Sequence, residues 1–275
     1  MSTRILRKTV ISILLLLTLI VPYCNATTSG GVYPPQFTYK SGEWYDSWGI
    51  TRTNAYGGNG YLPFILSETI GENRDIAFMM GENFRNSYLD RQNMAAMILD
   101  YVQTWVQYGY DVDNVFLNKV PQDEWAWNAD ELAYAFNETT GVAAIGDCED
   151  MAFLCATLYL GAGIDIAIVD APGHVALLIW LPDYPNANKY WDLTNDERGT
   201  GWIWVEATGP TNPLGWTPSE YTDGFWTAWS MDGDTYIEHD PVDNLTEDSE
   251  EGEISIWDII ITIIIIVFFL LSNRK

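Results

Sequence analysis

The feature that most constrains the fold is a run of residues, 151–161, that is apolar on nearly every side. A surface helix is apolar along one stripe only, whereas a helix that is apolar all round must be buried. Gly161 and Gly163 close the run, as glycines commonly do at the ends of helices. Cys148 lies where this helix should begin, so the sequence predicts a buried helix with a cysteine at its N-terminal end.

Periodicity predicts helices before this run and strands after it. Apolar residues spaced by three and four predict a helix over 93–108, and a second helical stretch covers 130–136. Helices first and strands second, without regular alternation, indicate an α+β fold with an antiparallel sheet. The predicted strands are 164–169, 174–181, 190–193 and 202–207.

The N-terminus is predicted to be a secretory signal peptide over residues 1–26. An apolar run at 10–21 follows three basic residues and precedes small residues that suit cleavage after Ala26. An uncleaved signal anchor is the alternative, and a lipid attached to Cys24 is less favoured because bulky residues precede it.

The C-terminus is predicted to be a single transmembrane helix over residues 254–272. The stretch is just long enough to cross a bilayer and ends beside Arg274 and Lys275. Basic residues favour the cytoplasmic side, so residues 273–275 form a cytoplasmic tail. We therefore expect a single-pass protein of the cell membrane whose body is extracellular.

Composition divides the rest of the chain into three parts. Residues 27–85 are rich in Gly, Pro and aromatic residues without a sustained period, which predicts an N-terminal extension of loops and short strands. Residues 86–230 carry the predicted helices and strands and form the main domain. Residues 231–253 are acidic and poor in apolar residues, which predicts a solvated stalk.

The charge of the chain limits its partners. The net charge is −25, and five of the 13 basic residues lie at the two ends, so the body is more acidic still. Such a body repels a phosphate backbone, which excludes nucleic acid as a partner. Strong acidity keeps a protein soluble in concentrated salt or makes it tolerant of a low pH, and the sequence does not choose between these two conditions. Because the body is expected to lie outside the cell, its expected substrate is an extracellular or envelope protein or peptide.

A thiol, an imidazole and a carboxylate occur in an order that suits nucleophilic catalysis. The whole chain holds three cysteines and two histidines, so few pairings are available. Cys148 follows Asp147, which can cap the helix, and the positive end of the helix dipole favours a reactive thiolate. Glu149 and Asp150 oppose the thiolate with their charge, which a nearby imidazolium would have to offset. His174 opens a predicted strand and can act as general base and acid.

The carboxylate that orients the histidine has two candidates. Glu206 shares a strand face with Trp202 and Trp204, so it should be partly shielded and able to hold an imidazole. Asp192 is the rival. Cys155 is two helical turns from Cys148, too far for a disulfide, and is predicted to be a core residue. No metal or cofactor is expected, because two distant histidines without paired cysteines make an incomplete ligand set.

The segments 146–150 (Gly-Asp-Cys-Glu-Asp), 172–174 (Pro-Gly-His) and 206–208 (Glu-Ala-Thr) resemble the motifs of the transglutaminase-like superfamily, in particular its bacterial and archaeal cysteine-peptidase-like branch. The resemblance spans about residues 93–216. It implies a papain-like α+β core in which the nucleophile helix packs on an antiparallel sheet.

The same resemblance assigns roles to individual residues. It implies Cys148 as the nucleophile, His174 as the base and Glu206 as the orienting acid. It also implies Gln103 as a possible oxyanion donor. Many relatives carry Asp where this chain has Glu206, and their Asp-Pro-Thr motif is partly matched at 192–194, so Asp192 stays open as the acid.

These residues predict a thiol acyl-transfer enzyme. Hydrolysis of a thioester intermediate would make it a cysteine peptidase or amidase, which is the favoured function. Transfer to an amine would make it a protein-glutamine cross-linker of the transglutaminase type. A non-catalytic cell-surface binding or structural module on the same fold is the alternative of a different class, since function resides in the site and not in the fold.

Overall fold

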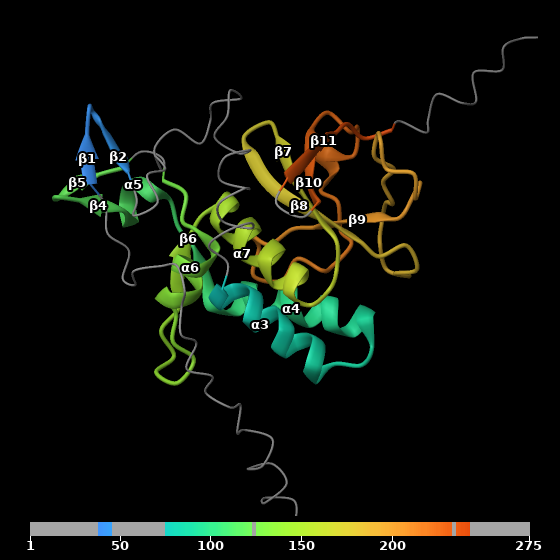
Figure 1. Cartoon of the computed structure of the whole chain (residues 1–275), viewed down its shortest axis with the longest axis horizontal. Coiled ribbons are helices and arrows are strands. Elements are labelled where there is room, and N and C mark those ends of the chain that lie inside the picture. The colour runs from blue at the N-terminus through green and yellow to red at the C-terminus, as the bar shows by residue number, and fades with distance from the viewer. Residues whose placement is uncertain (1–37, 46–74, 123–124, 233–234, 243–275) are drawn as a thin grey trace, which may run out of the picture.

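The protein has mixed α and β structure with an antiparallel main sheet (Figure 1). The computed structural model describes residues 38–45, 75–122, 125–232 and 235–242. The predicted signal peptide (1–26), transmembrane helix (254–272) and cytoplasmic tail (273–275) lie outside these residues. Among the residues that the structure describes, no helix is long and apolar enough to cross a membrane.

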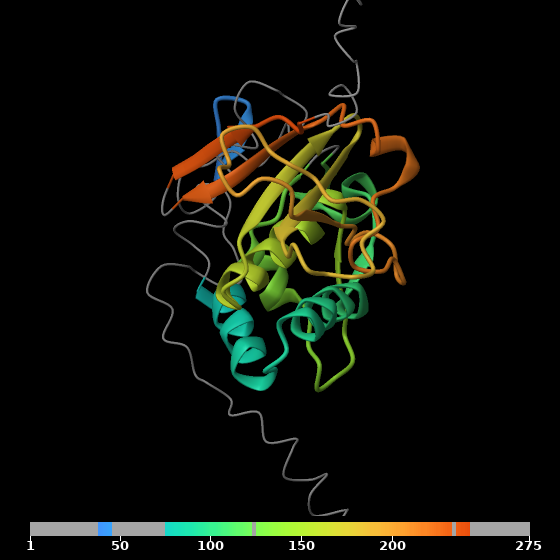
Figure 2. The ribbon, with the colours of Figure 1, turned by 90° about the vertical axis from the view of Figure 1, so that its right-hand side faces the viewer.

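Helix α7, Cys148–Gly161, is the central element. It lies between the main sheet on one side and helices α3, Asp75–Ser87, and α4, Arg91–Trp105, on the other (Figures 1 and 2). Every residue of α7 except Cys148 and Leu160 is buried. This confirms the predicted buried helix and explains its sequence, because a helix enclosed by two layers has no face for polar side chains.

Helices α3 and α7 touch backbone to backbone through two glycines. A Cβ atom on Gly81 would lie 2.1 Å from the carbonyl oxygen of Leu158, and one on Gly161 would lie 2.1 Å from that of Phe78. Only glycine allows this close approach. The predicted extension 27–85 is therefore wrong for its last residues, which form most of α3 and belong to the core.

The main sheet has the order β11-β10-β7-β8-β9, and every neighbouring pair is antiparallel. This confirms the predicted antiparallel sheet. The strands are β7 (Ile166–Ala171), β8 (His174–Trp180), β9 (Trp202–Val205), β10 (Thr227–Asp232) and β11 (Thr235–His239).

The sheet is covered on both faces. Ile168, Leu177 and Ile179 belong to the core cluster that includes the helices. Alternate residues such as Leu178 and Trp204 belong to a second cluster on the other face, rich in tryptophan. The alternation follows from the two-residue period of strands.

Two strand predictions differ from the structure. Residues 190–193 form only isolated bridges, Trp191 with Trp202 and Leu193 with Pro241, rather than a strand. Strands β10 and β11 were not predicted, and they pair with each other and with β7.

Among the described residues, the predicted stalk at 231–253 is wrong for 231–232 and 235–239. Residues 231–232 and 235–239 lie in strands of the sheet, and 243–253 lie outside the described residues. His239, placed in the stalk by the sequence, is buried and bonds to Ser230 and to the carbonyl oxygen of Thr194.

The predicted helix 93–108 ends early, because the chain becomes extended at Val106 and pairs in parallel with residues 144–146. The other elements of the described residues are short: β1 (Thr38–Lys40), β2 (Glu43–Tyr45), β3 (Val106–Tyr108), α5 (Asp111–Asn114), β4 (Phe116–Leu117), β5 (Val120–Pro121), α6 (Ala129–Ala135), β6 (Ala144–Gly146) and the 3-10 helix η2 (Ser219–Tyr221).

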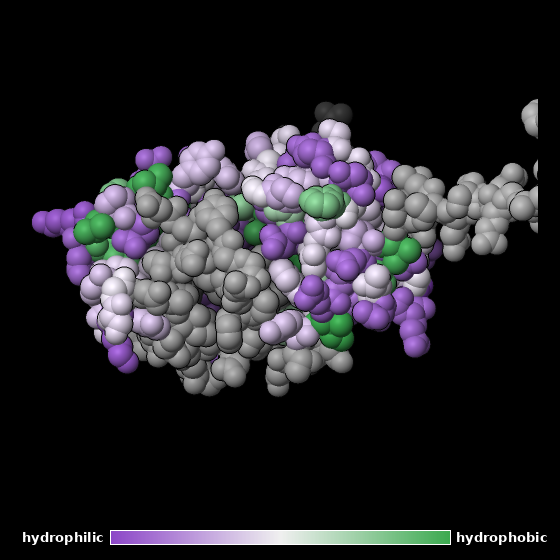
Figure 3. Space-filling view, turned by 90° about the horizontal axis from the view of Figure 1, so that it is seen from above, coloured by the Kyte–Doolittle hydropathy of each residue, from purple (hydrophilic) through white to green (hydrophobic). Residues whose placement is uncertain are grey.

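The surface of the described residues is mainly hydrophilic on the face in Figure 3, where hydrophobic residues are scattered rather than gathered. Isolated apolar residues are normal on protein surfaces. The hydrophilic face agrees with the net charge of −25.

Candidate active site

Cys148 is the first residue of α7. Asp147 is the N-cap residue, as the sequence predicts, and its backbone N–H donates to the Asp150 carboxylate over 3.1 Å. Cys148 is partly exposed, whereas its neighbours Asp147 and Glu149 are buried. The thiol therefore lies at the positive end of the helix dipole and is accessible from outside.

His174 is the first residue of β8 and follows a tight turn in which Gly173 has a φ of +70°. Its Nε2 lies 2.8 Å from Oε2 of Glu206, which follows the last residue of β9. Strands β8 and β9 pair with Leu177 opposite Val205. Continuing this register makes Glu206 a diagonal neighbour of His174 on the same face.

The imidazole also lies close enough to Cys148 for the thiol to affect its pKa. Since Glu206 occupies Nε2, the ring nitrogen left for the thiol is Nδ1. Burial alone would lower the pKa of His174, but hydrogen bonds to Cys148 and Glu206 and their negative charges outweigh it and raise the pKa to about 9. The positively charged imidazolium is therefore the favoured form at neutral pH.

Glu206 is held by four groups. Its Oε2 accepts from Trp204 Nε1 over 3.3 Å as well as bonding His174, and its Oε1 accepts from the Thr208 hydroxyl over 2.5 Å and from the Thr208 N–H over 3.3 Å. Burial favours the neutral acid, but the bond and charge of His174, together with Thr208 and Trp204, lower the pKa of Glu206. Glu206 is thus a fixed carboxylate that orients and charges the imidazole.

Tyr221 of η2 lies between two rings of the site. It stacks on His174 with ring centroids 5.5 Å apart and planes at 13°, and on Trp204 at 5.5 Å and 10°. Trp226 Nε1 donates to the Tyr221 carbonyl oxygen over 3.1 Å, which fixes this turn. The tryptophan-rich cluster on the outer face of the sheet thereby supports the imidazole.

Two predicted site residues lie elsewhere. Both hydrogens of the Gln103 amide are used in bonds from Nε2 to the carbonyl oxygens of Glu206, at 3.1 Å, and Asn212, at 3.0 Å. Gln103 therefore ties α4 to the Glu206 segment and has no N–H left for an oxyanion. Among the described residues, the acid bonded to His174 is Glu206, and no bond joins Asp192 to the imidazole.

A group of carboxylates surrounds the start of α7. Oxygens of Asp111, Asp147 and Asp150 lie within 4.8 Å of one another, and so do Asp147, Glu149 and the thiol sulfur. Backbone N–H groups already bond both oxygens of Asp150, from Trp127 at 2.6 Å and Asp147 at 3.1 Å, and a third bonds Asp111. Three backbone amides therefore already stabilise the carboxyl groups of Asp111 and Asp150.

Tyr108 and Tyr221 are neighbours of the site that sequence reasoning missed. Tyr108 pairs with Gly146 across β3 and β6, two residues before the cysteine. Burial, together with the negative charges of a Cys148 thiolate and of Asp147, raises the pKa of its hydroxyl. Neither tyrosine is close to Cys148 or His174 in sequence, so no local pattern could have identified them.

The site brings together a thiol, an imidazole and a carboxylate from three separate segments of the chain. No protein-family model, no curated protein and no solved structure matches the chain. Its resemblance to the transglutaminase-like superfamily stays a prediction that rests on the three motifs quoted above.

Proposed function

We propose that the protein is a thiol acyl-transfer enzyme of the transglutaminase-like type, with Cys148 as nucleophile, His174 as general base and acid, and Glu206 as the orienting acid. The observation that carries the proposal is that the three groups lie together: His174 Nε2 lies 2.8 Å from Glu206, and Cys148 is close enough to help raise the pKa of His174. A papain-like core with the nucleophile helix against the sheet belongs to the same proposal.

In the resting site the thiol proton is already on Nδ1 of His174, so Cys148 is a thiolate beside an imidazolium. The thiolate attacks the carbonyl carbon of an amide, and the C=O electrons move to the oxygen. When the C=O bond re-forms, the C–N bond breaks and His174 gives its proton to the leaving nitrogen, which leaves a thioester on Cys148. Water then gives a proton to the neutral imidazole and attacks the thioester, and departure of the sulfur restores the thiolate and the imidazolium.

The oxyanion donor is the backbone N–H of Cys148 in this proposal. N–H groups in the first turn of a helix have no acceptor within the helix and point out of its end. They stabilise negative charge on a nearby oxygen. This assignment replaces Gln103, whose amide is occupied.

Hydrolysis of an extracellular or envelope protein or peptide is the favoured outcome, which makes the enzyme a cysteine peptidase or amidase. The predicted signal peptide and C-terminal helix support a location at the outer side of the cell membrane. Transfer of the acyl group to an amine uses the same three residues, so product analysis with an added primary amine separates a cross-linker from a hydrolase.

The test is alkylation of the purified protein with iodoacetamide between about pH 4 and 9, with mass mapping to separate Cys148 from Cys155. We expect rapid labelling of Cys148 well below the ~8.5 at which an ordinary thiol titrates. His174→Ala should slow it strongly, because the imidazolium no longer stabilises the thiolate.

Cys155 is the internal control. It is fully buried, and burial raises the pKa of its thiol, so it should label only after unfolding. Labelling of Cys148 with the pH dependence of an ordinary thiol, unchanged by His174→Ala, would refute the enzyme and favour the binding module.

A further inference from the structure

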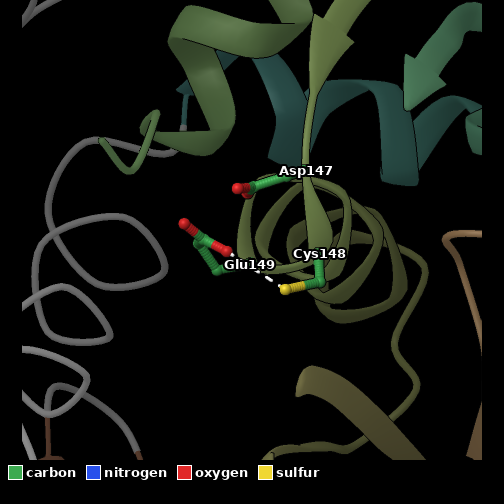
Figure 4. A group of neighbouring side chains, drawn as sticks. All are labelled: Asp147, Cys148 and Glu149. Atoms are coloured by element: carbon green, nitrogen blue, oxygen red, sulfur yellow. Dashed lines mark hydrogen bonds between the residues drawn. The ribbon is translucent and has the colours of Figure 1, made fainter. Parts of the chain in front are cut away.

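Two buried carboxyl groups flank the nucleophile, and each has an oxygen without a hydrogen-bond partner among the described residues. Glu149 is 3% exposed and Asp147 is 9% exposed, and the unpartnered atoms are Oε1 of Glu149 and Oδ1 of Asp147. The other Glu149 oxygen, Oε2, lies 3.3 Å from the Cys148 sulfur. Figure 4 shows both carboxyl groups on the same side of the first turn of α7.

Two negative charges cannot both persist in such a place. A buried carboxylate without partners is costly, and a second one beside it adds repulsion. Burial, the charge of Asp150 and a hydrogen bond to Asp147 raise the pKa of Glu149 well above its usual range. Burial also raises the pKa of Asp147, and a proton held between Oδ1 of Asp147 and Oε1 of Glu149 satisfies the two oxygens that otherwise lack partners.

The groups that face Glu149 reinforce the neutral form. Asp147, Asp150 and the Cys148 sulfur are anionic or can become so, and Tyr108 faces the pair from β3. The imidazolium of His174, which acts on the Cys148 thiol, is itself paired with Glu206. Negative charge on Glu149 would thus be opposed from several directions.

We propose that both groups are neutral: Asp147 donates its proton to Oε1 of Glu149, and Glu149 donates the O–H on its Oε2 to the Cys148 thiolate, as a second hydrogen-bond donor beside His174. The inference rests on the proposed function, because it concerns the thiolate of the same nucleophile. It reverses the expectation from sequence that Glu149 opposes the thiolate with its charge.

The protons balance at each step. In the resting pair, the thiol proton is on Nδ1 of His174 and Glu149 keeps its own. When sulfur attacks the carbonyl carbon, negative charge leaves sulfur and the bond from Glu149 weakens, but no proton moves along it. When the thioester breaks, the bond strengthens again and stabilises the departing thiolate.

A direct readout is the infrared carbonyl band of a protonated carboxyl group. At neutral pH the purified protein should show such a band, and Glu149→Gln should remove intensity from it. The matched control is Glu197→Gln, an exposed acid that should leave the band unchanged. An unchanged band in Glu149→Gln would overturn the proposal, whatever the reactivity of Cys148.

The second readout is the rate at which iodoacetamide labels Cys148. Glu149→Ala should slow labelling at neutral pH by on the order of tenfold, since it removes a hydrogen bond to a charged group. Glu149→Gln keeps an N–H donor of nearly the same shape and should lose less. Its labelling profile should also lack the pH-dependent change that deprotonation of Glu149 causes in the wild type.

The outcomes separate this inference from the proposed function. If His174→Ala slows labelling but both Glu149 variants match the wild type, the triad stands and the role of Glu149 is refuted. If Glu149→Gln is as slow as Glu149→Ala, the charge of Glu149 is what matters and the neutral donor is refuted. If Glu149→Ala does not fold, the band and pH profile of Glu149→Gln still decide.

Discussion

Replacing Glu206 by Gln tests how the imidazole is charged. A rise in the pKa of His174 from 6.5 to about 9 corresponds to about 3 kcal/mol in favour of the imidazolium. Cys148 and Glu206 supply this stabilisation against the cost of burial. If they share it about equally, loss of the Glu206 charge removes roughly 1.5 kcal/mol, or about one pKa unit.

Ring-proton NMR provides the assay, because the chain has only two histidines. The midpoint of the His174 pH titration should fall by about one pH unit or more in Glu206→Gln. The buried His239 acts as an internal reference, since it belongs to a different part of the sheet. Asp192→Asn is the matched control, and its His174 midpoint should equal that of the wild type.

The same substitution has a predictable effect on stability. Because the folded-state pKa of His174 is raised, its contribution to stability is fully present below about pH 6.5 and is lost as the pH rises through about 9. Glu206→Gln should therefore lower the free energy of unfolding at pH 7 by more than it does above pH 9. A His174 midpoint that stays fixed in Glu206→Gln, or one that falls in Asp192→Asn, would refute this account of the site.

Three further substitutions test the packing around the site. Gly161→Ala should lower stability by at least about 1–3 kcal/mol in denaturant unfolding, because its Cβ meets the Phe78 backbone, whereas Ser87→Ala at the exposed end of α3 should not. Tyr221→Ala should slow alkylation of Cys148 and Tyr221→Phe should not, because the stacked ring and not the hydroxyl supports His174. Cys155→Ala should leave the alkylation profile of Cys148 unchanged and lower stability by about 1 kcal/mol, which the denaturation midpoint measures.

The elements that could be predicted are those whose residues carry their own pattern. Helix α7 is apolar all round because it is enclosed, and strands β7, β8 and β9 are buried on both faces. Local composition therefore reveals them. The pairing of His174 with Glu206 followed from motif order, and the register of β8 and β9 accounts for it.

The elements that could not be predicted depend on contacts between distant residues. Helix α3 packs on α7 through Gly81, and no periodicity within α3 reveals this contact. Strands β10 and β11 contain polar and acidic residues and resemble a linker until β7 pairs with β10. Residues 190–193 alternate as a strand would, but they form only single bridges.

The charge of a residue is likewise decided by its surroundings. Sequence alone counts Glu149 as an anion, and only its burial beside Asp147 and Asp150 makes the neutral acid the favoured form. The choice between Glu206 and Asp192 depended in the same way on which side chain the register of the sheet brings to the imidazole.

The proposed nucleophile and its base belong to different layers, since Cys148 begins a helix, whereas His174 begins a strand of the sheet and Glu206 directly follows another. A slide of one layer over the other would separate sulfur from imidazole without breaking any strand pairing. Loss of activity on heating should therefore precede loss of secondary structure. The rate of the proposed reaction therefore reports how helix and sheet are positioned relative to each other. It should respond to a small displacement that leaves the circular dichroism spectrum unchanged.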